Sequence, residues 1–276
     1  MSDGTFGARH LRELLDAHGV RPRKALGQNF VIDPNTIRKM VATAGIRPDQ
    51  RVLEIGPGGG SLTVALAAAA RSVVAVELDR SLLPVLEETL ASAGNVEVVA
   101  GDAMRLDLAC FGASHLVGNL PYGIAAPLVV RALEEAPGIS ELTVMTQAEV
   151  GRRLAAGPGS KLYGRVSVVV GLFATAMTAM TVSRRAFFPV PRVDSVVVRI
   201  VRRPGPLEVD PGRLSAVARA AFSQRRKTLR NALADLAGSV ERAEEALARA
   251  GVEPGARAEA VDRDGFIALA RALTIP

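Results

Sequence analysis

The stretch VLEIGPGGGS, residues 52–61, decides the fold class of this chain. It opens with a short apolar run typical of a buried strand, continues into a glycine-rich loop, and leads into the helical pattern of residues 62–70. Glycines at 56, 58 and 60 allow the backbone to approach a ligand closely. A strand, a glycine loop and a helix in this order predict a nucleotide-type cofactor site in an α/β fold.

The same alternation continues along the chain. Strands are expected at residues 52–55, 73–76, 96–99, 116–117 and 142–146, separated by helices at 62–70, 81–90 and 126–133. Strands separated by helical segments of this length predict a parallel, doubly wound sheet. Ligand groups then gather at the carboxyl ends of the strands, which is where four residues of interest fall: Gly56, Glu77, Asp102 and Asn119.

The two ends of the chain have a different character. An amphipathic helix with Leu11, Leu14 and Leu15 on one face precedes the basic run 21–24, and Asp33-Pro34 begins a second helix. After residue 147 we expect strands near 166–173 and 195–201, a proline and glycine boundary at 204–206, and helices at 211–222, 225–237, 239–250 and 263–273. These features predict a catalytic domain over 1–203 and a small all-helical domain over 204–276.

Composition limits the kinds of partner and site. The net charge of +6 favours a polyanionic partner, and the single Cys110 excludes an internal disulfide and a cysteine cluster for zinc. The eighteen uncharged residues 166–183 contain Ser, Gly and Thr, so we interpret them as buried strands with a turn rather than a membrane span. The first residues do not resemble a signal peptide, and a soluble cytoplasmic protein without a metal site is expected.

The glycine loop alone does not distinguish between two cofactors. A glycine loop followed by an acidic residue at the next strand end, Glu77, is found in both NAD and S-adenosylmethionine sites. Three features favour S-adenosylmethionine: the G-x-G-x-G spacing, the position of Asp102 to bind an adenine amino group, and the sequence after the fourth strand. Nothing in the chain supplies an acid or base for hydride transfer, so an NAD-dependent dehydrogenase is the weaker alternative.

The sequence after the fourth strand is GNLPY, residues 118–122, which is either an ordinary turn or an amine-binding loop. It matches the (Asn/Asp)-Pro-Pro-Tyr signature of methyltransferases that act on exocyclic amino groups. The Asn119 side-chain oxygen and the Leu120 carbonyl would accept the two N–H groups of an adenine N6, Pro121 stiffens the loop, and Tyr122 would stack on the ring. Alignment and electrostatics would then carry most of the rate enhancement.

A base within a helix cannot reach such a pocket, so the target must be flipped out or single-stranded. A second aromatic ring would complete the clamp around the base, and Phe187 or Phe188 is the candidate, with Phe187 preferred from the motif. The alternative is that both are core phenylalanines beside prolines.

Together these segments resemble the bacterial 16S ribosomal RNA adenine dimethyltransferases. The resemblance rests on LGQNF (26–30), VLEIGPG (52–58), GNLPY (118–122), QAEV (147–150), PGSKLYG (158–164), AFFP with PRVDS (186–195) and AFSQRRKTLRN (221–231). Two positions depart from the family: Gly59 replaces the usual leucine, and Gly123 replaces a common asparagine. Both changes suggest added backbone freedom around the pocket.

The resemblance implies a Rossmann-like class I methyltransferase that uses S-adenosylmethionine to dimethylate N6 of two adjacent adenosines in a hairpin loop near the 16S RNA 3′ end. It implies a monomer that acts on the pre-30S subunit. Cofactor contacts are expected from Asn29, Val31, Gly56, Gly58, Glu77, Asp102 and Asn119. The target adenine is expected to contact Asn119, Leu120, Pro121, Tyr122 and Phe187. RNA contacts are expected from Arg23, Lys24, Arg225, Arg226, Lys227 and Arg230.

Two further alternatives share the fold. A 23S RNA methyltransferase of the antibiotic-resistance type has the same pocket, but it usually carries Asn-Ile-Pro-Tyr and lacks the SQRRKTL segment at 223–229. A ribosome-assembly factor would keep the fold without catalysis, which the intact catalytic positions argue against.

Overall fold

The computed structural model describes residues 6–205, 209–223 and 227–273. They belong to two compact units, the first comprising residues 1–152 and 177–202 and the second residues 153–176 and 203–276. This division differs from the one expected from the sequence, because residues 153–176 group with the C-terminal helices.

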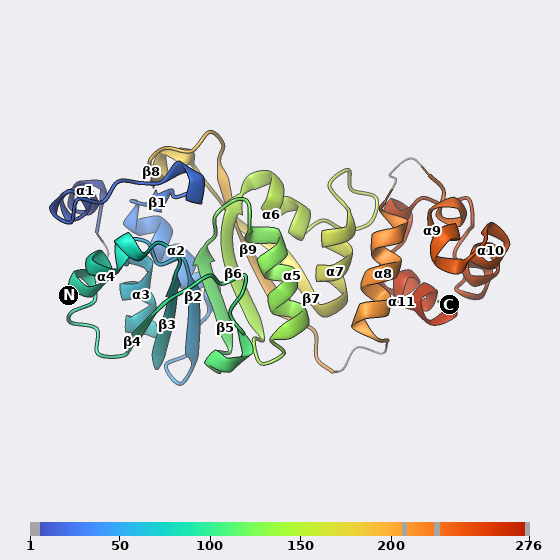
Figure 1. Cartoon of the computed structure of the whole chain (residues 1–276), viewed down its shortest axis with the longest axis horizontal. Helices are drawn as coiled ribbons and strands as arrows, with labels where there is room; N and C mark the ends of the chain where they lie inside the picture. The colour runs from blue at the N-terminus through green and yellow to red at the C-terminus, as the bar shows by residue number, and fades with distance from the viewer. Residues whose placement is uncertain (1–5, 206–208, 224–226, 274–276) are drawn as a thin grey trace. The chain divides into compact units, whose positions relative to one another are not determined.

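A seven-stranded sheet of order β4-β3-β2-β5-β6-β9-β7 forms the centre of the first unit (Figure 1). Neighbouring strands from β4 to β6 are parallel, and β9 runs antiparallel to β6, so the doubly wound α/β prediction is confirmed, with an antiparallel edge. The strands are β2 (Arg51–Ile55), β3 (Ser72–Glu77), β4 (Val96–Ala100), β5 (His115–Asn119), β6 (Glu141–Gln147), β7 (Ala174–Val182) and β9 (Ser195–Arg202).

Helices lie between these strands, and the sequence predicts the residues that cap helix α2. Asp33 accepts hydrogen bonds from the Asn35 and Thr36 N–H groups at the start of α2, and Gly45 ends that helix with a φ of +61°. The α-helices of this region are α1 (Ala8–Ala17), α2 (Pro34–Ala44), α3 (Ser61–Ala69), α4 (Leu83–Thr89), α5 (Ala125–Glu135) and α6 (Ala148–Leu154). The short 3₁₀ turns are η1 (Lys24–Leu26), η2 (Arg80–Leu82), η3 (Ala109–Phe111) and η4 (Arg184–Ala186).

A buried helix face and a strand pairing help to hold the N-terminal segment on the sheet domain. The predicted amphipathic helix α1 buries Leu11, Leu14 and Leu15 in a cluster with Phe30 and Leu82. A separate two-stranded sheet pairs β1 (Phe30–Val31) with β8 (Phe187–Phe188), so that Phe30 faces Phe188 in register. This pairing links the LGQNF segment to the AFFP segment.

The second unit is helical among its described residues, apart from the start of β7. Its elements are α7 (Arg165–Phe173), α8 (Pro211–Ala221), α9 (Leu229–Ala237), α10 (Val240–Arg249), η5 (Ala258–Ala260) and α11 (Arg263–Ala272). The strand expected near 166–173 is wrong: this run is α7, because a short continuous apolar run fits a buried helix as well as a buried strand. Among the described residues, no helix has both the length and the apolar composition needed to cross a membrane.

Candidate active site

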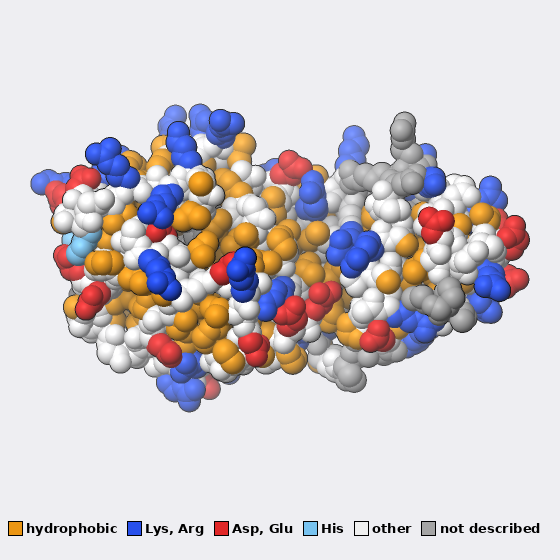
Figure 2. Space-filling view, viewed as in Figure 1, with side chains coloured by type: hydrophobic (Ala, Val, Ile, Leu, Met, Phe, Trp, Pro, Cys, Tyr) orange, Lys and Arg blue, Asp and Glu red, His pale blue; other side chains and the backbone are white. Residues whose placement is uncertain are grey.

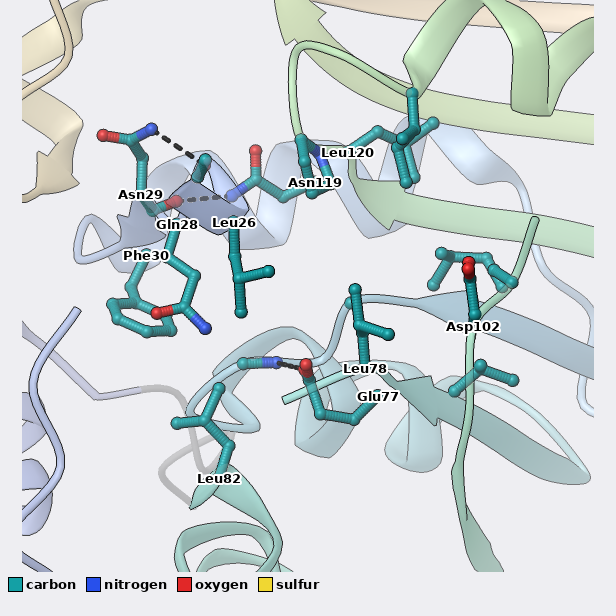
Figure 3. A pocket seen from close by; sticks show the side chains of 18 of the residues that line it. Leu26, Gln28, Asn29, Phe30, Glu77, Leu78, Leu82, Asp102, Asn119 and Leu120 are labelled. Carbon is teal, nitrogen blue, oxygen red and sulfur yellow. Dashed lines mark hydrogen bonds between the residues drawn. The ribbon is translucent and has the colours of Figure 1, made fainter. Parts of the chain in front are cut away.

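Four neighbouring strand ends meet at one cavity in the first unit (Figure 3). Gly56 follows β2, Glu77 ends β3, Asp102 lies two residues beyond β4, and Asn119 ends β5. The space is about 740 Å³ when its open mouth is included. The remaining wall comes mainly from the segment before β1 and the turn after β5, through Leu26, Gly27, Gln28, Asn29, Phe30, Leu120, Pro121, Tyr122 and Ile124.

The glycine loop lets the backbone itself form one wall. Gly56 and Gly58 have φ values of +73° and +59°, a region that residues with a side chain rarely adopt. A Cβ atom on Gly58 would also lie only 2.8 Å from the ring of Phe30. Gly59 has no positive φ; a Cβ there would lie 2.5 Å from Leu11 of α1. Its role is therefore to make room for Leu11, rather than to give the backbone freedom.

Glu77 is held in place by backbone donors. Its carboxylate accepts hydrogen bonds from Gly58 N–H at 3.1 Å and from Asp79 N–H at 2.8 Å, and only 5% of the residue is exposed. Burial raises the pKa of Glu77, an effect that the hydrogen bonds from Asp79 and Gly58 only partly offset. The carboxylate thus has a defined orientation at the wall of the cavity.

Asp79 connects this strand end to the N-terminal wall of the cavity. Its buried carboxylate accepts a hydrogen bond from Gln28 Nε2 at 2.8 Å and lies 3.3 Å from the Arg23 guanidinium. Burial alone would raise the pKa of Asp79, but hydrogen bonds from Ser81 and Gln28 outweigh it, and the net pKa is lowered. Sequence reasoning did not single out Gln28 or Asp79, although Asp79 lies two residues beyond Glu77.

Asn119 is oriented by the N-terminal segment beside it. Its side-chain Nδ2 donates a hydrogen bond to the Asn29 backbone carbonyl at 2.7 Å (Figure 3). The following residue, Leu120, is 1% exposed and donates its N–H to the Met145 carbonyl. A Cβ on Gly118 would lie 2.6 Å from the Ile55 carbonyl oxygen, so only glycine allows β5 to approach β2 this closely.

The aromatic residues divide between cavity and core. Tyr122 lines the cavity, and burial raises its pKa. Phe187 does not line the cavity: it is 1% exposed and packs in the core with Ile37, Met40 and Val197. Its neighbour Phe188 is half-buried and carries the Arg12 guanidinium 4.6 Å from its ring centre. The structure thus places Phe187 where the core alternative expects it.

Val31 lines an adjoining smaller cavity, which shares Phe30, Gly56 and Asn119 with the first. Glu54 also lines this space; it is fully buried, and neither carboxyl oxygen has a hydrogen-bond partner within the described residues. Burial raises the pKa of Glu54 to about 8, so this side chain is mainly protonated at neutral pH.

The predicted RNA-contact residues have mixed surroundings. Lys24 and Lys227 are exposed, whereas Arg23 pairs with Asp79 and Arg230 pairs with Glu244 at 2.9 Å. Arg225 and Arg226 lie outside the described residues. Within the part of the chain that the structure describes, no group of three or more His, Cys, Asp or Glu residues is arranged to hold a metal ion.

Known proteins resemble this chain over almost its whole length. The small-subunit ribosomal RNA methyltransferase A of Streptomyces coelicolor is 48% identical, covering 97% of this chain and 96% of that protein. The protein of the same name from Nocardia farcinica is 47% identical, covering 96% and 94%.

Two solved structures share the fold. A dimethyladenosine transferase from Plasmodium falciparum has a TM-score of 0.77 and 25% identity, covering 87% of this chain and 95% of that one. The 23S rRNA methyltransferase ErmE has a TM-score of 0.70 and 33% identity, covering 89% and 99%. A sequence profile described as Ribosomal RNA adenine dimethylase matches residues 19–274. With these matches and a cavity of the expected composition, the chain belongs to the ribosomal RNA adenine dimethylase family, whose members are S-adenosylmethionine-dependent enzymes.

Proposed function

We propose that this enzyme dimethylates N6 of two adjacent adenosines in a hairpin loop near the 3′ end of 16S rRNA. Support comes from the relatives at 47–48% identity, which are named for the small ribosomal subunit. The observation that carries the proposal is the hydrogen bond from Asn119 to the Asn29 carbonyl, because it orients the side chain for an adenine amine. The enzyme acts as a cytoplasmic monomer on the pre-30S subunit.

The cavity residues fit S-adenosylmethionine. The buried Glu77 carboxylate suits the two ribose hydroxyls, and Asp102 lies at the next strand end to accept from the adenine amino group. The Gly56 and Gly58 backbone leaves the space that a side chain would fill. Asn29 and Val31 complete the predicted cofactor contacts. When bound, S-adenosylmethionine supplies an electrophilic methyl group on its sulfonium sulfur.

Asn119 and Leu120 prepare the acceptor. Since Asn119 Nδ2 is already donating to Asn29, its Oδ1 is the atom left to accept an N–H from adenine N6. The Leu120 carbonyl accepts the other N–H, and Pro121 stiffens the backbone that presents both acceptors. Two such acceptors favour a pyramidal nitrogen with its lone pair available for attack. The rate then comes from alignment and electrostatics rather than from a strong base.

Tyr122 lines the cavity and stacks on the target base. The Phe187 ring lies in the core, so a clamp that uses it needs a rearrangement around β8. RNA contacts through Lys24, Lys227 and the segment containing Arg225 and Arg226 belong to the same proposal.

One experiment separates this function from its rivals. Unmethylated 30S particles are incubated with the protein and labelled S-adenosylmethionine, and the modified nucleotides are mapped. We expect label at two adjacent adenosines near the 16S 3′ end. Similarity to ErmE makes 23S rRNA the second candidate, so unmethylated 50S particles are assayed in parallel. Label in 23S rRNA alone would refute the proposal, and binding of 30S without any transfer would favour a non-catalytic assembly factor.

A further inference from the structure

The loop between β7 and β9 carries three exposed arginines near the active-site cavity. Arg184 and Arg185 lie in η4, just before β8, and Arg192 follows β8. None of the three side chains has a charged partner among the described residues. In Figure 2, basic side chains project along the edge of the molecule above the region where Figure 1 labels β8.

This loop is tied to the cavity wall by backbone hydrogen bonds. Ile32 N–H donates to the Ala186 carbonyl at 2.8 Å, and β8 pairs with β1, so that Phe188 lies opposite Phe30. Phe30 itself lines the cavity. The arginines are therefore attached, within a few residues, to the wall of the cavity.

The loop is also closed upon itself. The Arg184 N–H donates to Asp194 Oδ1 at 2.9 Å, and the Asp194 carbonyl accepts from Ala148 N–H at 3.0 Å. Pro189 and Pro191 restrict the backbone between these ties. Asp194 is the one acidic residue of the segment 183–194, and it already accepts the Arg184 N–H. Three guanidinium groups thus project from a stiff loop with little local neutralisation.

Apolar side chains lie between the charges. Val190 is 59% exposed and Val193 is 46% exposed, on the same loop as Arg192. On the α1 side, the exposed Arg12 stacks over Phe188. Alternating cationic and apolar groups suit a nucleic-acid strand, whose phosphates pair with arginine and whose sugars and bases contact apolar surface.

We propose that Arg184, Arg185 and Arg192 form an arginine rim that binds the phosphates of the RNA strand on either side of the flipped target adenosine. This inference rests on the proposed function for which RNA is bound. The contact between arginine and phosphate does not depend on that function. Phosphate contacts orient a strand without reading its sequence. The rim therefore contributes to the RNA affinity of the enzyme and leaves cofactor binding unchanged.

The test uses the full-length variant Arg184→Gln/Arg185→Gln/Arg192→Gln. The matched control is Lys39→Gln/Arg47→Gln/Arg71→Gln, in which the same charge is removed from exposed positions. Arg47 and Arg71 lie just before β2 and β3, at the amino ends of the strands, whereas the cavity lies at their carboxyl ends. Binding of a single-stranded adenosine 20-mer RNA is measured over a salt series. In parallel, KM for unmethylated 30S particles and the affinity for S-adenosylmethionine are measured.

Since each phosphate contact on a single strand contributes about −0.7 to the slope of log K against log salt, we expect the slope of the rim variant to be about 2 less negative than that of wild type. KM for 30S should rise roughly tenfold or more at 150 mM salt, with the affinity for S-adenosylmethionine unchanged. A salt slope equal to that of the control variant would overturn the inference. A raised KM for 30S with an unchanged slope would also overturn it, since it would assign the rim to a protein of the particle.

If wild-type protein does not methylate 30S particles, the proposed function fails. The comparison of salt slopes still decides whether the rim binds RNA, so the two failures are distinguishable.

Discussion

The side-chain amide of Asn119 donates a hydrogen bond to the backbone carbonyl of Asn29 across 2.7 Å, between residues 90 positions apart in the sequence. It joins the end of β5 to the segment before β1, and both residues line the cavity. The contact determines which end of the amide faces the ligand, because a carbonyl oxygen accepts only from the NH2 end.

Asn119→Ala should lower kcat for methyl transfer by about 10²–10³-fold, since an oriented acceptor is lost. Binding of 30S should remain largely intact. Asn119→Asp should not restore activity, because a carboxylate oxygen would then face the Asn29 carbonyl oxygen. Label incorporation into 30S particles measures both variants. Wild-type activity in Asn119→Asp would show that the Asn29 contact does not set the orientation.

Asp79→Asn should weaken S-adenosylmethionine binding by roughly tenfold, because loss of a charged buried partner costs about 1–3 kcal/mol. The variant loses the ion pair with Arg23, and the wall carrying Gln28 and Asn29 should exchange amide hydrogens faster. Calorimetry and hydrogen exchange test the two effects. Asp49→Asn is the control, since Asp49 is exposed and pairs with the exposed Arg47. Equal cofactor affinities in both variants would contradict this role for Asp79.

Gly59→Leu should destabilise the protein by about 1–3 kcal/mol, because the new side chain would occupy the space of Leu11. Adding Leu11→Ala to Gly59→Leu should recover part of the lost folding stability. Denaturant titration of the single and double variants measures this coupling. Gly94→Leu is the control, because a Cβ on Gly94 meets open space. Strictly additive losses at 11 and 59 would refute the steric explanation.

The stability of Glu54→Gln should rise relative to that of wild type as the pH rises, because wild type loses the contribution of its protonated Glu54. The pKa of Glu54 is raised by burial from 4.5 to about 8, so the folded protein binds its proton more tightly than the unfolded chain does. That contribution to stability is complete below pH 4.5 and is lost as pH rises through about 8. The Tm difference between variant and wild type should therefore widen from pH 5 to about pH 8.5. The exposed Glu87→Gln is the control; a Tm difference independent of pH would contradict the prediction.

Phe187→Ala should cost about 3–5 kcal/mol of folding stability, since the ring is buried in the core. Phe188→Ala should cost clearly less, because its ring is only half-buried. Thermal unfolding compares the two variants. A stable Phe187→Ala protein that has lost only methyl transfer would instead restore the base clamp expected from the sequence.

These residues show why the sequence predicted some features and missed others. Strands β2 to β6 and the capped helix α2 follow from local periodicity and from single cap residues such as Asp33. The run 166–173 carries no such signal, because continuous apolar composition fits both a helix and a strand. The ion pair of Arg23 with Asp79 was also missed, since a basic run indicates charge but not the position of a buried carboxylate.

The sequence by itself determined the α/β class, the strand ends that carry Gly56, Glu77, Asp102 and Asn119, and the family. Each of these depends on residues close together in the chain, where hydrophobic period and turn chemistry act locally. Only the tertiary structure decided the orientation of Asn119, the burial of Phe187 and the contact of Gly59 with Leu11. These depend on which distant segments pack together, and packing is decided by the shape and burial of the whole core.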